Sequence, residues 1–310
     1  ETMKIYTKWI DLRNEASGMA VALGMFDGVH RGHQSIIRRA VELAKKTGKK
    51  RAVFSFSNHP LSVLAPASLP PQIGDTKLKE LLLGRLGVDI FLCLPFTKKL
   101  AREKPEDFLL HLKQYFAPSY VVTGPNFTFG SKGKGTHRML MRVAEDYGFR
   151  AEICPVVMED GAPVSSTRIR SLLAAGNLAL ANNFLGYPFT VLGRVIHGDR
   201  RGRLLGFPTA NLAIPDERVM LPNGVYAAEA VLGQVHYNAL ANIGTNPTFT
   251  GCNRRLEVNL QDFTGDIYDC LLEVRFLGNL RDEKKFASVD ELVRQMKRDR
   301  EKAKKIWTRS

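Results

Sequence analysis

The chain has 310 residues, of which 44% are hydrophobic and 25% charged, and its formal net charge is +14. This length favours two domains that each bury a core, and no apolar run approaches the roughly 20 residues needed to cross a bilayer, so we expect no membrane-spanning segment. The positive charge favours an anionic partner, such as nucleic acid, an anionic lipid surface or phosphorylated small molecules, unless it is only a basic surface without a specific partner.

The first half of the sequence alternates short apolar runs with amphipathic segments. The spacing predicts helices between successive strands, and therefore a Rossmann-like α/β domain with a parallel sheet covered by helices on both faces. In such sheets, ligands bind beyond the carboxyl ends of the strands. The predicted strands are 19–26, 51–57, 88–96, 119–124 and 149–157, and the predicted helices are 34–48, 76–87, 105–116 and 137–148.

The pattern changes near Leu185 to short strands separated by Gly, Asn and Asp, which predicts a small antiparallel β-barrel or sandwich. A closing helix over 288–307 has Ser288 as its N-cap and Glu291 three residues later. Its many Lys and Arg residues favour a solvated face over a nucleic-acid arm. We place the two domains at residues 3–183 and 184–310. The predicted strands are 187–198, 224–232, 235–244, 254–263 and 270–276.

The segment GMFDGVHRGH, residues 24–33, joins the first predicted strand to the first predicted helix. Glycines at such a turn let the backbone bend tightly and approach a ligand, and the helix start is a ready anion site. His30 and His33 are three residues apart, so both rings can point to one side and donate hydrogen bonds to phosphate oxygens. This combination suits a triphosphate during cleavage at its α-phosphorus. A metal site on the two histidines is the less favoured alternative, because no further His or Cys is close in sequence.

The segment SSTRIR, residues 165–170, precedes a helical pattern. Ser165, Ser166 and Thr167 can cap that helix, and Arg168 and Arg170 add charge beside its positive end. Hydroxyl groups, a helix N-terminus and arginines together form a cradle for an anion. The alternative is an ordinary capped helix.

The segment LLGFPTANL, residues 204–212, is the conspicuous string of the second half. Gly206 and Pro208 shape a turn. The Thr209 hydroxyl and the Asn211 amide oxygen are hard ligands of the kind that Mg²⁺ accepts beside phosphate oxygens and water. The alternative is a surface turn, in which Pro, Thr and Asn are common.

Several strings resemble bacterial FAD synthetases, which are α/β nucleotidyltransferases with an HxGH signature. These strings are GMFDGVHRGH, FSFSNHP (54–60), TGPNFTFG (123–130) and VSSTRIRSLLAAGNL (164–178). Asn58 and Ser57 stand where the family usually has Pro and an acidic residue, and Pro163 where many members have Arg. The resemblance implies catalytic roles for His30 and His33. It implies ATP contacts for Gly24, Phe26, Asp27, Gly28, Ser166, Thr167 and Arg170, and flavin contacts for His59, Pro60, Asn126 and Phe127.

The second half resembles riboflavin kinases, whose signature is Gly-Phe-Pro-Thr-Ala-Asn. The resemblance implies that Thr209 and Asn211 hold Mg-ATP, with Gly206 in the same site, and that Glu257 is the catalytic residue. Strand alternation puts Glu257 and Asn259 on the face opposite Leu256, Val258 and Leu260. The segment RDEKKF (281–286) implies a flavin contact for Arg281, while Tyr268-Asp269 departs from the family's usual Tyr-Gly.

Together the resemblances imply a bifunctional enzyme of the riboflavin kinase/FMN adenylyltransferase family. It would phosphorylate riboflavin to FMN in the second domain and adenylylate FMN to FAD in the first, using ATP and Mg²⁺. We expect small-molecule nucleotides and flavins as partners, no nucleic acid and no membrane, and we leave room for weak self-association. The alternatives are an FMN adenylyltransferase with a degenerate kinase module and, more remotely, a basic nucleic-acid-binding protein.

The four cysteines, Cys93, Cys154, Cys252 and Cys270, are far apart and form no C-x-x-C pair. A zinc site or a disulfide framework is therefore not expected. Scattered thiols are typical of small core residues and fit a reducing compartment, so we expect a cytoplasmic protein.

Overall fold

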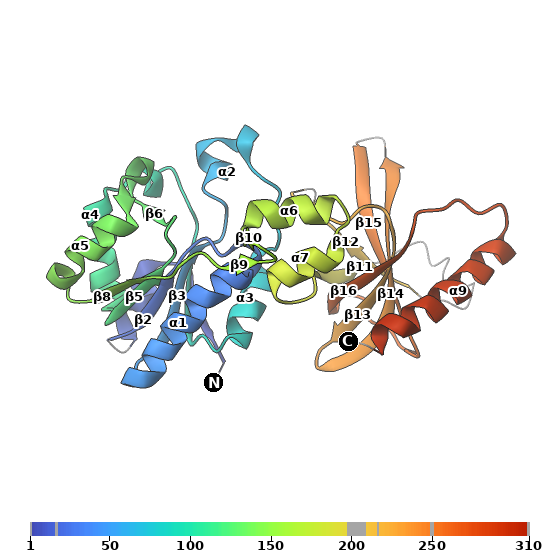
Figure 1. Ribbon diagram of the computed structural model, residues 1–310, viewed down its shortest axis with the longest axis horizontal. Helices are drawn as coiled ribbons and strands as arrows, with labels where there is room; N and C mark the ends of the chain where they lie inside the picture. The colour runs from blue at the N-terminus through green and yellow to red at the C-terminus, as the bar shows by residue number, and fades with distance from the viewer. Residues whose placement is uncertain (1, 16–17, 197–208, 216, 249–250, 309–310) are drawn as a thin grey trace. The chain divides into compact units, whose positions relative to one another are not determined.

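The computed structural model describes residues 2–15, 18–196, 209–215, 217–248 and 251–308 (Figure 1). Its contacts divide the chain into two compact units, Glu1–Pro70 with Lys79–Ser165, and Pro71–Leu78 with Ser166–Ser310. The predicted domain boundary at residues 183 and 184 falls inside the second unit and stays a prediction. Each unit has its own sheet and its own core.

The first unit contains a six-stranded parallel sheet with the order β1-β4-β3-β2-β5-β8. The strands are β1 (Lys4–Tyr6), β2 (Ala20–Leu23), β3 (Arg51–Phe56), β4 (Ile90–Leu94), β5 (Tyr120–Thr123) and β8 (Arg150–Ile153). The sequence pattern predicted all of them except β1. That edge strand has three residues, too few to show an apolar period.

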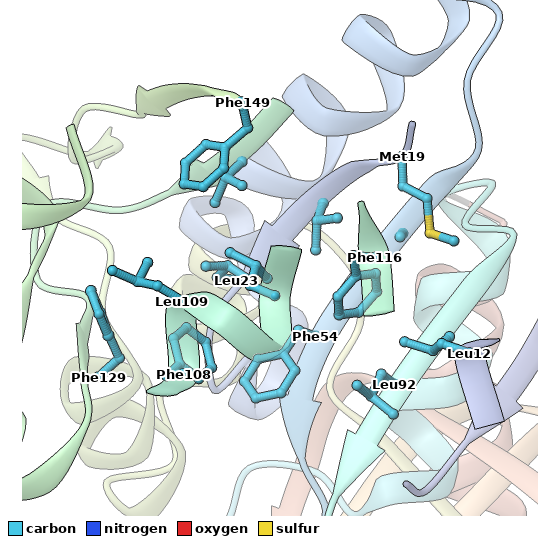
Figure 2. Packing of buried hydrophobic residues seen from close by; sticks show 14 of the residues in the cluster. Leu12, Met19, Leu23, Phe54, Leu92, Phe108, Leu109, Phe116, Phe129 and Phe149 are labelled. Carbon is cyan, nitrogen blue, oxygen red and sulfur yellow. The ribbon is translucent and has the colours of Figure 1, made fainter. Parts of the chain in front are cut away.

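Helices cover both faces of this sheet (Figure 1). On one face, Val21 and Leu23 of β2 share a core with side chains of α4 (Pro105–His111) and α5 (His137–Tyr147). Figure 2 shows part of this core, where the rings of Phe54 and Phe108 lie 5.4 Å apart. Since side chains alternate along a strand, Ala20 and Ala22 face the other side, which is covered by α1 (Arg31–Thr47).

Two helices of the first unit differ from their predicted form. α1 begins at Arg31, three residues before the predicted start at residue 34, because His30 is its N-cap. The predicted helix over 105–116 ends as α4 at His111 and continues as a π-helix, Leu112–Phe116. The buried apolar positions fit both windings, so the sequence predicted the element and not its hydrogen-bond pattern.

Shorter elements complete the first unit. They are α2 (Leu61–Leu64), the part of α3 (Thr76–Arg85) from Lys79 onward, 3₁₀ turns at Trp9–Asn14, Asp27–Val29, Pro66–Ser68, Leu100–Arg102 and Ser131–Gly133, and the hairpins β6 (Thr128–Phe129) with β7 (Gly135–Thr136) and β9 (Met158–Glu159) with β10 (Ala162–Pro163).

The second unit contains a closed barrel with the order β11-β12-β15-β14-β13-β16, and its strands pair antiparallel. The strands are β11 (Thr190–Ile196), β12 (Ala210–Ala213), β13 (Gly224–Leu232), β14 (Val235–Thr248), β15 (Gly251–Leu260) and β16 (Leu271–Asp282). Fully buried side chains such as Leu256, Val258 and Phe276 fill the inside. The helices α6 (Ser166–Ala174) and α7 (Leu178–Leu185) precede the barrel.

The closing helix α9 (Val289–Trp307) packs against β13, β14 and β16 (Figure 1). The predicted N-cap is confirmed, since the Ser288 hydroxyl accepts a hydrogen bond of 3.2 Å from the Glu291 N–H. Near the other end, the indole N–H of Trp307 donates to the Ala228 carbonyl over 2.9 Å. The helix is therefore held to the barrel wall at its far end as well as capped at its start.

The cysteine prediction is only partly confirmed. Cys93 and Cys154 are free, buried thiols, as expected, whereas Cys270 is exposed just before β16. Cys270 lies at a turn that leads into β16. The wide separation of the cysteines in the sequence does not show whether such a position is buried or exposed. The side chain of Cys252 lies outside the described residues.

Candidate active sites

The order of the parallel sheet places β2 at a topological switch point. The chain passes from β2 to β3 on one side and later returns to β5 on the other side of β2. Ligands of doubly wound sheets bind at such a point, beyond the carboxyl ends of the strands. The segments that follow β2, β3 and β5 begin at this edge, and they carry the predicted residues 24–33, 57–60 and 124–127.

The segment after β2 is tightly folded. Phe26, Gly28 and Val29 have φ values of 51°, 73° and 38°, in the left-handed region that favours glycine. A β-branched residue such as Val29 adopts this conformation only when the surroundings impose it. Phe26 is fully buried, and a Cβ added to Gly24 would lie 2.6 Å from its ring. The segment is therefore a close-packed turn.

The two predicted histidines come together at the start of α1. Their rings are stacked, with centroids 3.6 Å apart and planes 18° from parallel. The His33 backbone N–H donates to Nδ1 of His30 over 3.4 Å, which leaves Nε2 as the donating nitrogen of that ring. The His33 ring also lies nearly perpendicular to the Phe26 ring, with ring centroids 5.4 Å apart. The expectation that both imidazoles share one side of the turn is confirmed.

Hydrogen bonds fix the segment after β3. The Asn58 amide donates to the carbonyl of Phe96 (3.1 Å) and to the hydroxyl of Ser62 (3.0 Å), and its oxygen accepts the Phe96 N–H (2.7 Å). His59 accepts the Leu61 N–H on Nδ1 over 3.1 Å, and Pro60 precedes α2. Asn58 thus ties this turn to the segment after β4 and supplies a rigidity that a proline would otherwise give.

The segment after β5 is joined to β2 at its base, where the Thr123 hydroxyl donates to the Leu23 carbonyl over 3.0 Å. Beyond it, Asn126 is exposed, and Phe127 is half-buried with its ring stacked on that of Phe129 at 5.8 Å. Both residues are candidates for flavin contact at the sheet edge that carries the histidines.

The predicted anion cradle of residues 165–170 occupies the first turns of α6. Ser166 and Arg170 are half-buried and Thr167 is exposed, while the Arg168 guanidinium lies over the Phe184 ring at 5.3 Å. α6 belongs to the second compact unit and the histidines to the first. A shared site of Ser166, Thr167 and Arg170 with His30 therefore stays a prediction.

In the barrel, strand register brings two predicted residues side by side. Asn211 of β12 lies directly opposite Glu257 of β15, and directly paired residues project from the same face of a sheet. Leu256 and Val258 are completely buried whereas Glu257 is half-buried. The predicted alternation is thus confirmed, and Asn211 and Glu257 lie on the outer face of the barrel.

The same register identifies a residue that the sequence analysis did not single out. Asn242 of β14 lies opposite Glu257 on the side away from Asn211, so three polar residues form a row across β12, β15 and β14. The Arg255 guanidinium donates to Glu257 over 3.2 Å. Asn242 belongs to a long strand with no other signal, and only the pairing shows that it neighbours the glutamate.

The amide oxygen of Asn211 is buried and has no hydrogen-bond partner among the described residues. An unsatisfied buried acceptor is costly unless a ligand occupies it, and this oxygen suits a hard cation. Thr209 lies two residues before it and is half-buried. Gly206, the remaining predicted residue of this string, lies outside the described residues.

Arg281, the predicted flavin contact at the end of β16, already has an internal partner. Its Nε donates to both carboxylate oxygens of Asp299 in α9, over 2.9 and 3.2 Å, and Nη1 donates to the Asp282 carbonyl over 3.0 Å. Asp299 is 1% exposed. The described contacts of Arg281 therefore anchor α9, and its flavin contact stays a prediction.

These features define a class of protein. Stacked imidazoles at a helix start, beyond the switch point of a parallel sheet, suit the phosphates of a nucleotide. A carboxylate beside an amide oxygen on a barrel wall suits phosphoryl transfer with a divalent ion. The fold and the two sites are those of an enzyme that transfers phosphorus-containing groups.

The comparisons with known proteins identify the family. The sequence pattern of the FAD synthetase family matches residues 12–168, and that of the riboflavin kinase family matches residues 185–307. Bifunctional riboflavin kinase/FMN adenylyltransferases from Escherichia coli K12 and Bacillus subtilis are 37% and 34% identical to the chain, each over 94% of this chain and 93% of the relative. The relative from Pseudomonas fluorescens is 37% identical over 91% of both chains. The chain therefore belongs to the bifunctional riboflavin kinase/FMN adenylyltransferase family.

A solved structure agrees along the whole chain. It is titled a macrolide-efflux protein from Streptococcus pneumoniae, and it matches with a TM-score of 0.84 and 34% identity over 98% of this chain and 99% of that one. Within the described residues, none of the helices has the length and apolarity that a bilayer crossing requires. The match to the solved structure supports the order of α/β unit, barrel and closing helix along the chain.

Proposed function

We propose that the chain makes FMN from riboflavin and ATP in its barrel, and FAD from FMN and ATP, with release of pyrophosphate, in its α/β unit. The family membership supports both activities. The single observation that carries the division is that two constellations, the stacked His30 and His33 and the paired Asn211 and Glu257, lie in different compact units. The enzyme thus runs two phosphorus transfers at two sites.

In FAD formation, a phosphate oxygen of FMN attacks the α-phosphorus of ATP and pyrophosphate leaves. His30 and His33 donate hydrogen bonds to the ATP phosphates and stabilise the charge that develops there, so catalysis consists of positioning and electrostatic stabilisation. Further ATP contacts are proposed for Gly24, Phe26, Asp27, Gly28, Ser166, Thr167 and Arg170. Flavin contacts are proposed for His59, Pro60, Asn126 and Phe127.

In FMN formation, Glu257 accepts the proton of the ribityl hydroxyl while the hydroxyl oxygen attacks the γ-phosphorus of ATP, and ADP leaves. The half-buried carboxylate is oriented by Arg255 at 3.2 Å and flanked in the row by Asn211 and Asn242. Gly206 is proposed for the same ATP site, and Arg281 for flavin contact.

Mg²⁺ fits this barrel site, because the buried Asn211 oxygen has no hydrogen-bond partner among the described residues. Thr209 and Asn211 would hold the ion, and it would neutralise charge on the ATP phosphates. Mg²⁺ is also proposed for FAD formation. Small-molecule nucleotides and flavins are the proposed partners, in a cytoplasmic setting.

One experiment tests the division. Wild-type protein, His30→Ala and Glu257→Ala are each given ATP with either riboflavin or FMN, with Mg²⁺ or with excess chelator, and the flavin products are separated by chromatography. We expect His30→Ala to form FMN but at least 100-fold less FAD, as for loss of a key group that stabilises the transition state, roughly 10²–10³ in rate.

Glu257→Ala should show the opposite pattern, with little FMN from riboflavin and normal FAD from FMN. Chelator should stop both steps. The division is wrong if either variant, still folded by circular dichroism, loses both activities.

A further inference from the structure

Lys79 is the most deeply buried lysine among the described residues, at 7% exposure, on α3 of the first unit. Its ammonium donates to the Met25 carbonyl (2.8 Å), the Phe56 carbonyl (3.0 Å) and the Ser55 hydroxyl (3.1 Å). An ammonium has three protons and no acceptor. All three protons of Lys79 therefore have a partner in this cage.

The cage lies at the carboxyl ends of β2 and β3. Phe56 is the last residue of β3, and Met25 lies two residues after the end of β2. The Met25 carbonyl accepts a second hydrogen bond, from the Ser55 hydroxyl at 2.8 Å. This carbonyl belongs to the peptide that leads into Phe26, whose φ of 51° begins the left-handed turn. Two donors thus fix the peptide at which the candidate nucleotide segment leaves the sheet.

A buried charge at this place is expensive. Burial lowers the pKa of Lys79, and nearby Asp27 and Cys93 oppose that shift. An apolar side chain of similar length would avoid the cost of burying an ammonium. The three hydrogen bonds of the ammonium offset the cost of burying it. They join the ends of β2 and β3 to the start of the turn between Gly24 and His33.

We propose that Lys79 is a positioning residue of the FAD-forming site, which holds the Met25–Phe26 peptide so that the turn presents His30 and His33 to ATP. Lys79 acts through this turn and does not itself contact the substrate. The inference rests on the proposed adenylyl transfer at this site. Ser55 shares the same carbonyl and is part of the same device.

The test uses the full chain and three single variants. Lys79→Met removes the ammonium, Ser55→Ala removes the second donor, and Lys77→Met makes the same chemical change at an exposed position of α3. For each variant, kcat and the KM for ATP are measured for FAD formation from FMN. The same quantities are measured for FMN formation from riboflavin, and thermal unfolding is followed in parallel.

We expect Lys79→Met to lower kcat/KM of FAD formation at least about tenfold, mainly through a higher KM for ATP, because a hydrogen bond to a charged group is lost. FMN formation should stay within about twofold of wild type, as should both activities of Lys77→Met. Ser55→Ala should give a smaller loss of the same kind. In the double variant, the loss should be less than the product of the single losses, because both donors act on one carbonyl.

Unchanged kinetics of FAD formation in folded Lys79→Met overturns the inference and leaves the proposed function standing. An equal fall of both activities also overturns it, because the lysine would then support the fold alone. If Lys79→Met does not fold, Ser55→Ala decides, and wild-type kinetics in that variant overturn the inference. Absence of FAD formation by wild-type protein overturns the proposed function and the inference together.

Discussion

Gly24 shows how one missing side chain shapes the candidate nucleotide site. The Phe26 ring occupies the space where a Cβ of residue 24 would lie, and the same ring packs against that of His33. The ring is completely buried, so it has little room to retreat. The position of His33 therefore depends on the absence of a side chain at Gly24, nine residues earlier in the sequence.

A Gly24→Ala substitution should displace the Phe26 ring, because the new methyl carbon would lie 2.6 Å from it. Overpacking of this kind costs roughly 1–3 kcal/mol. We expect FAD formation from FMN to fall about tenfold or more, with FMN formation from riboflavin unchanged. Kinetics of the two steps measured on one preparation check this. Gly84→Ala is the control, since nothing lies within 4 Å of its added Cβ and its φ is outside the left-handed region.

Two departures from the family pattern have physical explanations at the residue scale. Asn58 replaces a proline, and its three hydrogen bonds to Ser62 and Phe96 hold the turn. Asp269 replaces a glycine at a φ of 61°, and Asp is among the residues that tolerate this region best. The sequence shows both substitutions, but only the structure shows that the local conformations remain available.

At the scale of elements, the period of apolar residues was enough to predict most helices and strands, and the register of the barrel was not. Alternation along β15 predicted which face carries Glu257. The pairing of Glu257 with Asn211 on one side and Asn242 on the other depends on how three strands slide against one another. That choice is made by distant side chains and turns. Asn242 was missed for this reason.

A buried ion pair contributes to the docking of α9 on the barrel, beside the Trp307 hydrogen bond. Asp299, 1% exposed, accepts two hydrogen bonds from Arg281 and a third, of 2.9 Å, from the Gln295 amide. Breaking a buried pair leaves an uncompensated charge, which costs roughly 3–5 kcal/mol. The sequence predicted α9 and its cap, but nothing in the sequence distinguished Asp299 from the other acidic residues of this helix.

Asp299→Ala should therefore lower the free energy of unfolding by about 3 kcal/mol. The measurement is urea denaturation followed by tryptophan fluorescence in a Trp9→Phe background, where the signal comes from Trp307, whose indole is bonded to the barrel. Glu301→Ala is the matched control on the same helix, since that side chain is 67% exposed and paired with the exposed Lys304. It should cost less than about 1 kcal/mol. Equal midpoints for the two variants would rule out the anchoring role of Asp299.

At the scale of the whole molecule, fold class and family could be read from the sequence because both halves combine a clear period with specific strings. The parallel sheet was predicted from the alternation of strands and helices, and an antiparallel barrel or sandwich from the spacing of the later strands, with the barrel implied by the family resemblance. The strand order, the stacking of His30 on His33 and the cage around Lys79 could not be, because each depends on contacts between segments far apart in the chain.

Two sites built on separate constellations should complement one another in trans. We expect a mixture of His30→Ala and Glu257→Ala proteins to convert riboflavin to FAD, although neither does so alone, because the first supplies FMN and the second adenylylates it. Chromatography of the flavins over time checks this. A mixture of His30→Ala and His33→Ala, both impaired in the same step, should accumulate FMN only. Failure of the first mixture to yield FAD would mean that FMN does not pass between molecules.

The outward position of Asn211 and Glu257 separates two demands on the barrel. Leu256 and Val258 point inward and stabilise the barrel wall, while the alternate positions of the same strands carry the proposed reacting groups. Interior side chains can therefore be exchanged for others of similar volume to raise thermal stability without changing the residues on the outer face. Natural substitutions among the interior side chains are tolerated in the same way, because they leave the strand register of Asn211, Glu257 and Asn242 unchanged.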